Sequence, residues 1–158
     1  ADQLIDFTVA LDKLDKIGFD GVIKELKQKS FTADAIERIT PLISLTSSAH
    51  DRLSQLEEFL SDTEIGKQGI EELRFVVSRS EALGVKGTAL SVDVTLARVL
   101  NYYTGCIFEV SPPEGVKMGS IGGGGRYDDL TAGFGMKNMS GVGISFGFDR
   151  IYLVLEEL

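Results

Sequence analysis

The sequence lacks tryptophan and holds one cysteine, one histidine and three prolines among its 158 residues. The lone Cys106 has no second cysteine with which to form an internal disulfide, which is typical of a reducing compartment. No apolar run approaches the ~20 residues that a membrane-spanning helix needs, and no signal peptide is visible. Hydrophobic residues make up 43% and charged residues 25%, so the composition is globular rather than disordered.

Positive charge is scarce as well, because 16 lysines and arginines stand against 24 aspartates and glutamates, for a formal net charge of −8. A phosphate backbone repels such a chain at long range, so a protein that coats nucleic acid broadly is excluded. A local basic site remains compatible with this composition. The length corresponds to about one ordinary domain.

Glycine and charge divide the chain into two parts. Six of the 18 glycines lie in residues 1–87 and twelve in 88–158, whereas the first part carries 16 acidic residues and the second carries 8. We place a composition boundary near Gly84–Gly87, between a helical part and a part rich in strands.

Apolar residues of the first part recur every three or four positions, as on one face of a helix. The clearest stripe runs from Leu4 to Ile17, and Gly18 is expected to end it. Further helices are predicted around residues 22–26, 33–39, 53–60 and 70–77, with Ser48 as the cap of the fourth helix. The only histidine, His50, has no acidic or thiol partner at ligand spacing, so we expect an ordinary surface residue.

Four stretches of the second part alternate apolar residues with polar or small ones, which predicts strands. They are Leu90–Leu96, Cys106–Val110, a stretch from about Met118 into the glycines, and Gly141–Gly147. Within two of them, Ile121–Gly125 and Gly143–Gly147, one strand face has almost no side chains and cannot pack a core. We favour a bare floor for a flat ligand there, and close packing of another element on the glycines is the alternative.

The glycine run does not match the common phosphate-binding loops. GSIGGGGRYDDL has neither a GxGxxG register before a helix nor a GK[ST] end. Arginines would then have to hold any phosphate, which their guanidinium groups do in a bidentate manner. Arg98, Arg126 and Arg150 each flank a strand or a glycine segment, and surface ion pairing with the many acidic residues is the alternative for each.

Two adjacent tyrosines, Tyr102 and Tyr103, precede the second predicted strand. On an extended segment they point to opposite faces, so that one supports the core while the other offers its hydroxyl to a ligand. Tandem aromatic residues in a strand belong to the core far more often than to a binding site, so the pair alone is a weak signal.

Three motifs resemble signatures of the histidyl-tRNA synthetase family. LARVLNYYTGCIFEV is similar to RGLDYYTG followed by FE, GGGGRYDDL is similar to GGRYDGL, and GVGISFGFDRIYLVL resembles the third signature of class II synthetases. The helical first part resembles the insertion domain that precedes this half of the catalytic core. The resemblance implies an α+β fold, with a helical insertion domain followed by part of an antiparallel class II catalytic sheet and flanking helices.

The family's reaction forms histidyl-adenylate from L-histidine and ATP and then transfers the histidyl group to tRNA(His). By resemblance, Arg98 is the catalytic arginine and also contacts histidine, and Tyr103 is the better candidate for contact with the imidazole. The implied histidine site further contains Tyr102, Tyr127, Gly123 and Gly124, and the implied ATP site contains Arg150, Gly147 and Gly143. Mg²⁺ accompanies ATP as part of the substrate, and no tightly bound metal with protein ligands is expected. The resemblance also implies a cytoplasmic homodimer without a membrane partner.

Two positions depart from the family pattern, because Val99 stands where the family has glycine and Asn101 where it has aspartate. Valine adds bulk and disfavours a positive φ beside Arg98, whereas asparagine keeps a hydrogen bond and loses a charge. The family's first two class II signatures and its anticodon-binding domain are not found in these 158 residues. We therefore expect a piece of a longer enzyme that is inactive alone, with the helical part including the insertion domain in residues 1–86 and the C-terminal half of the catalytic core in 87–158.

Two other functions fit the same resemblance. One is a histidine-binding regulatory subunit of ATP phosphoribosyltransferase, and the other is a synthetase-like domain that senses uncharged tRNA. Val99 favours such degenerate relatives, while Arg98, the tyrosine pair and Arg150 favour the synthetase. A structural domain without a ligand does not explain two bare strand faces flanked by arginines.

Overall fold

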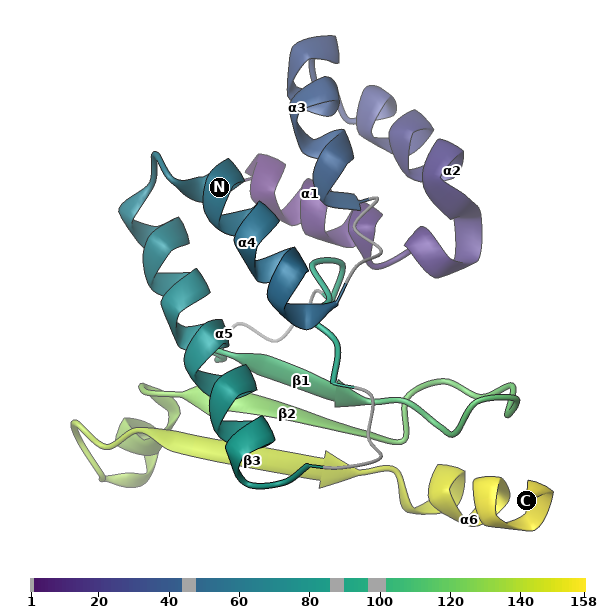
Figure 1. Cartoon of the computed structure of the whole chain (residues 1–158), viewed down its shortest axis with the longest axis vertical. Coiled ribbons are helices and arrows are strands. Elements are labelled where there is room, and N and C mark those ends of the chain that lie inside the picture. The colour runs from purple at the N-terminus through teal and green to yellow at the C-terminus, as the bar shows by residue number, and fades with distance from the viewer. Residues whose placement is uncertain (1, 44–47, 86–89, 97–101) are drawn as a thin grey trace. The chain divides into compact units, whose positions relative to one another are not determined.

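The computed structural model describes residues 2–43, 48–85, 90–96 and 102–158 (Figure 1). Internal contacts divide the chain into two compact units, Ala1–Val99 and Leu100–Leu158. The first unit is helical and the second carries the sheet, so the chain is an α+β protein. Within the described residues, no helix is long and apolar enough to cross a membrane.

The first unit contains five helices, but the stripe from Leu4 to Ile17, predicted as one helix, is divided between the first two of them. They are α1 (Asp2–Leu11), α2 (Leu14–Gln28), α3 (Ala33–Ile43), α4 (Ala49–Leu60) and α5 (Glu64–Ala82). The predicted cap is confirmed, because the Ser48 hydroxyl accepts a hydrogen bond from the Asp51 amide at 3.2 Å. The expected helix end at Gly18 is only partly right, since α2 continues beyond it with a kink. Gly18 adopts a φ of 69°, a left-handed value that glycine reaches without steric cost.

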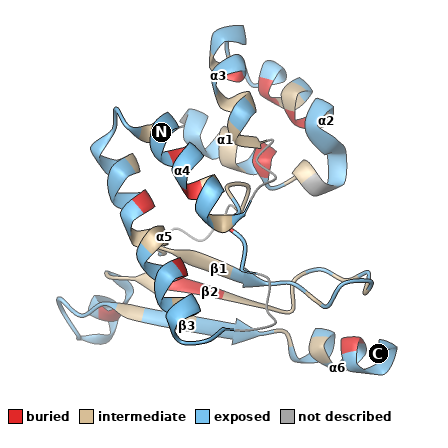
Figure 2. Ribbon diagram, in the orientation of Figure 1, coloured by how far each residue is buried: buried red, intermediate tan, exposed pale blue. Residues whose placement is uncertain are grey.

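Two apolar clusters hold the helices of the first unit together, and Figure 2 shows buried positions on these helices in red. The first cluster joins α1, α2 and α3 through Ala10, Leu11, Val22, Leu26 and Ile36. The second joins α4 and α5 through Leu53, Leu56, Ile70 and Val77, and it also includes Val92. Burial of each such aliphatic side chain contributes about 1.5–3 kcal/mol, so the stripes seen in the sequence account for the packing of both clusters.

The strand predicted at Leu90–Leu96 is wrong. The segment is irregular and ends in a turn at residues 94–95, and Val92 packs into the second cluster instead of a sheet. The Arg52 guanidinium donates hydrogen bonds to the Val92 carbonyl at 2.7 Å and to the Ser91 hydroxyl at 3.1 Å. A side chain of α4 thus supplies the partner that a neighbouring strand would have offered to this backbone.

The second unit contains a three-stranded antiparallel sheet in the order β1-β2-β3. The strands are β1 (Ile107–Val110), β2 (Gly122–Tyr127) and β3 (Gly141–Phe146), which confirms the other three strand predictions. A short 3-10 helix, η1 (Leu130–Phe134), lies in the connection from β2 to β3, and α6 (Phe148–Glu157) follows β3.

Candidate functional site

The register of the sheet divides its glycines between two faces. Gly125 pairs with Ile107 and Gly143, while Gly124 pairs with Phe108 and Ile144. Paired residues of an antiparallel sheet share a face and neighbours along a strand alternate. We call the face that contains Gly125 the small-residue face. Its residues are Ile107, Glu109, Gly123, Gly125, Tyr127, Gly141, Gly143 and Ser145.

The run Gly122–Gly125 is therefore divided between the two faces of the sheet. Gly122 and Gly124 lie on the opposite face, which carries Arg126 and the exposed apolar side chains of Val142, Ile144 and Phe146. Gly123 belongs to the small-residue face. Gly124 lies on the other face, and its role in the histidine site stays a prediction.

Tyrosine rings cover part of the small-residue face. A Cβ atom at Gly125 would lie 2.8 Å from Cδ1 of Tyr103, and one at Gly143 would lie 3.2 Å from Cε1 of Tyr127. Gly125 is buried, in line with this close approach. Close packing on the glycines, the alternative to a bare floor, is thus present at these two positions. The two tyrosines that pack there are themselves predicted site residues.

The three predicted tyrosines form one cluster. The ring centroids of Tyr102 and Tyr103 are 4.4 Å apart, and the Tyr102 hydroxyl donates a hydrogen bond to the Tyr103 hydroxyl at 3.3 Å. Tyr127 meets Tyr102 edge to face, with centroids 6.4 Å apart. The prediction that Tyr102 and Tyr103 point to opposite faces is wrong, because the described residues just before β1 form a turn and a bend rather than a strand.

Asp128, which the sequence did not single out, joins the ends of this site. Its carboxylate accepts hydrogen bonds from the Thr104 hydroxyl at 2.8 Å and from Nε of Arg126 at 3.1 Å. Hydrogen bonds from Ser140, Thr104 and Arg126, in that order, lower the pKa of Asp128 below its usual value. The motif could have identified Asp128 as a site residue, since Asp128 occupies the aspartate position of the GGRYDGL pattern.

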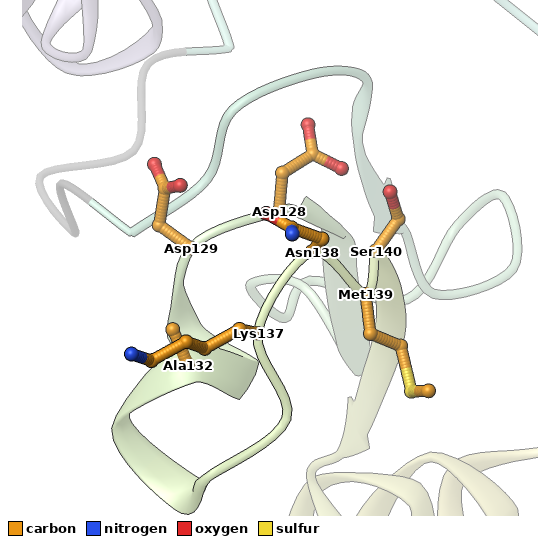
Figure 3. A pocket seen from close by; sticks show the side chains of 7 residues that line it. All are labelled: Asp128, Asp129, Ala132, Lys137, Asn138, Met139 and Ser140. Atoms are coloured by element: carbon orange, nitrogen blue, oxygen red, sulfur yellow. The ribbon is translucent and has the colours of Figure 1, made fainter.

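A cavity of about 480 Å³ lies beside Asp128. Figure 3 shows its lining, which comes from the end of β2, from η1 and from the residues that lead into β3. The lining residues are Asp128, Asp129, Ala132, Lys137, Asn138, Met139 and Ser140.

The three arginines of the second part have different surroundings. Arg126 forms an ion pair with Asp128, as the surface-pairing alternative predicts. Arg150 is exposed, and its Nη1 donates a hydrogen bond to the Ser120 carbonyl at 2.5 Å, so it ties the start of α6 to the segment before β2. Arg98, Val99 and Asn101 lie outside the described residues.

The two glycines predicted to contact ATP lie at β3. Gly143 lies beneath the Tyr127 ring. The Gly147 amide donates to the Ile121 carbonyl at 2.8 Å, so this donor already has a partner in the protein. A contact between Gly147 and ATP would therefore use atoms other than its N–H.

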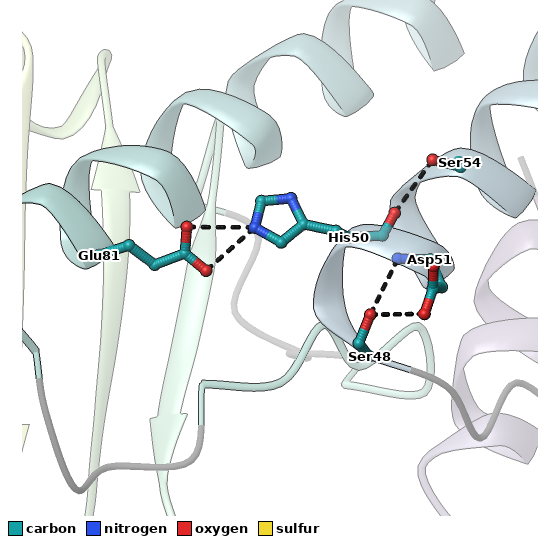
Figure 4. Close-up of polar contacts among 5 residues, drawn as sticks. All are labelled: Ser48, His50, Asp51, Ser54 and Glu81. Atoms are coloured by element: carbon teal, nitrogen blue, oxygen red, sulfur yellow. Dashed lines mark hydrogen bonds and ion pairs between the residues drawn. The ribbon is translucent and has the colours of Figure 1, made fainter.

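His50 is an exposed residue, as expected, but it has an acidic partner. Figure 4 shows that its ring reaches from α4 to Glu81 of α5, with Nε2 at 2.9 and 3.1 Å from the two carboxylate oxygens. Exposed pairs of this kind contribute little to stability. Among the residues with described placement, no three histidine, cysteine or acidic side chains are grouped so that they could hold a metal ion.

Comparisons with known proteins cover nearly the whole chain. A family model described as histidyl-tRNA synthetase matches residues 3–151. The histidine–tRNA ligase of Flavobacterium johnsoniae is 61% identical over 158 residues, which are 100% of this chain and 33% of that protein. The histidine–tRNA ligase of Bacteroides fragilis is 51% identical over 100% of this chain and 34% of its own length.

Solved structures show the same relationship. The histidyl-tRNA synthetase from Nostoc sp. PCC 7120 superposes with a TM-score of 0.88 at 32% identity, over 99% of this chain and 37% of that one. A histidine–tRNA ligase subunit from Alicyclobacillus acidocaldarius gives a TM-score of 0.65 at 27% identity, over 99% of this chain and 48% of that one. The fold of the chain is therefore that of a class II synthetase. More narrowly, the chain belongs to the histidyl-tRNA synthetase family, and it spans about a third of the length of the curated relatives it matches.

Proposed function

We propose that this chain contributes to a histidine–tRNA ligase, which activates L-histidine with ATP and transfers the histidyl group to tRNA(His). The observation that carries the proposal is the tyrosine cluster on the small-residue face, in a chain that is 61% identical to a histidine–tRNA ligase. The proposed activity is that of the whole protein, since the chain spans about a third of the length of the relatives it matches.

In the proposed reaction, a carboxylate oxygen of histidine attacks the α-phosphorus of ATP and pyrophosphate leaves. A hydroxyl at the 3′ end of tRNA then attacks the carbonyl carbon of the adenylate, and AMP leaves. Arg98 stabilises the charge that develops at the α-phosphate, Arg150 holds the γ-phosphate, and Tyr103 and Tyr127 flank the imidazole. Mg²⁺ enters with ATP as part of the substrate.

We further propose the architecture that follows from the family. Residues 1–86 include the helical insertion domain and 87–158 form the C-terminal half of the catalytic core. The complete enzyme acts as a cytoplasmic homodimer.

The test is histidine-dependent exchange of pyrophosphate into ATP, measured on the natural gene product that carries this sequence. The proposed enzyme incorporates label into ATP with histidine and not with other amino acids. Histidine binding without any exchange would favour a regulatory subunit instead, and binding of uncharged tRNA without exchange would favour a tRNA sensor.

The Tyr103→Phe substitution is expected to weaken discrimination in favour of histidine. A site built to hydrogen-bond a polar substrate group rejects analogues that lack it, and the variant removes one such hydroxyl. The Tyr103 ring and its contact with Gly125 are retained, so packing is preserved. The measurement is kcat/KM for exchange with histidine against an analogue whose ring lacks nitrogen, and an unchanged ratio would contradict the role given to Tyr103.

The 158-residue chain by itself is expected to show no exchange above background. It lacks the first two class II signatures, so the parts of the catalytic core that they form in the family are missing from it. The apolar side chains of β3 are also left exposed in the chain alone, with Val142 69%, Ile144 50% and Phe146 63% exposed. The same assay compares the isolated chain with the natural gene product, and robust exchange by the isolated chain would refute this expectation.

A further inference from the structure

We propose that Asp128 is a positioning residue for the histidine site, because its carboxylate fixes the two tyrosine-bearing segments relative to each other. This inference rests on the proposed function and adds to it a residue that acts through the tyrosine-bearing segments. It concerns the Asp128 carboxylate and not that of the neighbouring Asp129, which has a different environment.

The first argument is the position of Asp128 in the sheet. In this antiparallel sheet, the start of β1, the end of β2 and the start of β3 lie at the same end of the sheet. Asp128 follows β2 directly, Thr104 lies three residues before β1, and Ser140 lies directly before β3. The Thr104 hydroxyl donates a hydrogen bond to the Asp128 carboxylate at 2.8 Å, and Ser140 lies near enough to help lower its pKa, so the carboxylate lies where the ends of the three strands meet.

The second argument is what these strand ends carry. Thr104 directly follows Tyr103, and Asp128 directly follows Tyr127. The Thr104 amide also donates to the Arg126 carbonyl at 3.0 Å, and the Arg126 amide donates to the Cys106 carbonyl at 2.9 Å. Backbone hydrogen bonds thereby join the two segments at residues directly next to Tyr103 and Tyr127. The Asp128 carboxylate adds a side-chain link between the same two segments.

The third argument is chemical. An ionised carboxylate only accepts hydrogen bonds, and its two oxygens each receive one here, from Thr104 and from Arg126. An asparagine amide would turn an N–H donor toward one of these two donors. Because the pKa of Asp128 is lowered, the ionised form stabilises the fold fully above the ordinary value of about 3.9. That contribution to stability is lost only as the pH falls through the lowered pKa of Asp128 in the folded protein. The hydrogen bonds of its carboxylate are therefore intact throughout the neutral range.

Asp129 provides a matched control. It lines the same cavity and bears the same charge, but in the described part of the chain its exposed carboxylate makes no hydrogen bond or ion pair. It also occupies the position at which the family pattern has glycine, so it has no implied role. Figure 3 shows the Asp129 side chain separated from those of Asp128 and Ser140.

The kinetic experiment compares Asp128→Asn and Asp129→Asn in the natural gene product, using histidine-dependent pyrophosphate exchange. Asp128→Asn is expected to raise KM for histidine by about tenfold, with KM for ATP unchanged, because the hydrogen bonds lost are charge-assisted. Asp129→Asn is expected to match the wild type. Equal behaviour of the two variants, or an equal rise in both KM values, would overturn the proposal.

A second measurement does not depend on the enzyme's activity. The 158-residue chain has four tyrosines and no tryptophan, and three of the tyrosines form the cluster. With the fourth removed as Tyr152→Phe, the tyrosine band of the near-ultraviolet circular dichroism spectrum, read at wavelengths longer than the phenylalanine bands, reports the cluster. Asp128→Asn is expected to lose much of this signal while the far-ultraviolet spectrum persists, and a retained tyrosine signal would count against the positioning role.

The two readouts separate the possible failures. Absence of histidine-dependent exchange in the wild type would overturn the proposed function, while the dichroism would still decide the role of Asp128. If Asp128→Asn does not fold, Thr104→Val removes one of the hydrogen bonds and leaves the others in place. It is then expected to raise KM for histidine by a smaller factor, and a wild-type KM in this variant would contradict the proposal.

Discussion

Gly124→Ala is expected to destabilise the sheet unit more than any other single methyl group added to its glycine run. A Cβ atom at this position would collide with the carbonyl oxygen of Gly143 on the neighbouring strand and would lie 2.8 Å from Cζ of Phe108. Phe108 is a side chain that can turn away, but the Gly143 carbonyl belongs to the backbone of β3. The strands can therefore make room only by giving up pairing.

Overpacking in a well-packed site costs about 1–3 kcal/mol, and the Gly124→Ala variant is expected at the upper end of that range because backbone must move. The measurement is urea unfolding of the 158-residue chain, read as a shift of the midpoint at constant slope. Gly133→Ala in η1 is the matched control, since its Cβ would meet nothing within 4 Å. We expect that control to be neutral or up to about 1 kcal/mol more stable. Equal stability of the two variants would show that the approach of the two strands is looser than in the structure.

The sequence predicted those elements whose pattern is local. The apolar stripes of the five helices and the alternation in β3 were sufficient, because each reports the burial of its own element. The prediction at Leu90–Leu96 failed for a physical reason. Alternation shows which side chains are buried together, but it does not say whether a helix pair or a sheet buries them, and here α4 and α5 do so.

The candidate site was predicted in its residue types and not in its arrangement. Tyr102, Tyr103 and Tyr127 come together as the motifs imply. Their common side of the sheet depends on the bend at Gly105, which interrupts the extended geometry that the prediction assumed.

Contacts between distant residues were beyond the sequence altogether. The bonds of Asp128 to Thr104, of His50 to Glu81 and of Arg52 to Val92 join residues 24, 31 and 40 positions apart. Each one involves an ordinary charged residue whose neighbours in the chain give no sign of its partner. A polar contact of this kind becomes visible only once the elements that carry the two groups are packed.

Arg98→Ala is expected to have the largest effect on the proposed reaction. The role given to Arg98 is to stabilise charge that develops as histidine attacks the α-phosphorus, so its loss raises the barrier more than it weakens the ground state. Removal of one fixed electrostatic stabiliser typically lowers kcat about 10²–10³-fold, and we expect a fall of that order in histidine-dependent pyrophosphate exchange. KM for histidine is expected to change much less.

Two further variants sharpen this measurement on the natural gene product. Arg98→Lys keeps the charge and loses the bidentate geometry, so it is expected to recover only part of kcat. Arg79→Ala removes an arginine of α5 whose guanidinium lies 5.3 Å from the Phe75 ring, in the helical unit, and should leave exchange unchanged. Equal losses in kcat and in histidine affinity for Arg98→Ala would mean that the arginine binds the substrate carboxylate without favouring the transition state. A wild-type kcat would remove Arg98 from the site, and Val99 beside it would then mark a chain that has kept the fold of the family and lost its chemistry.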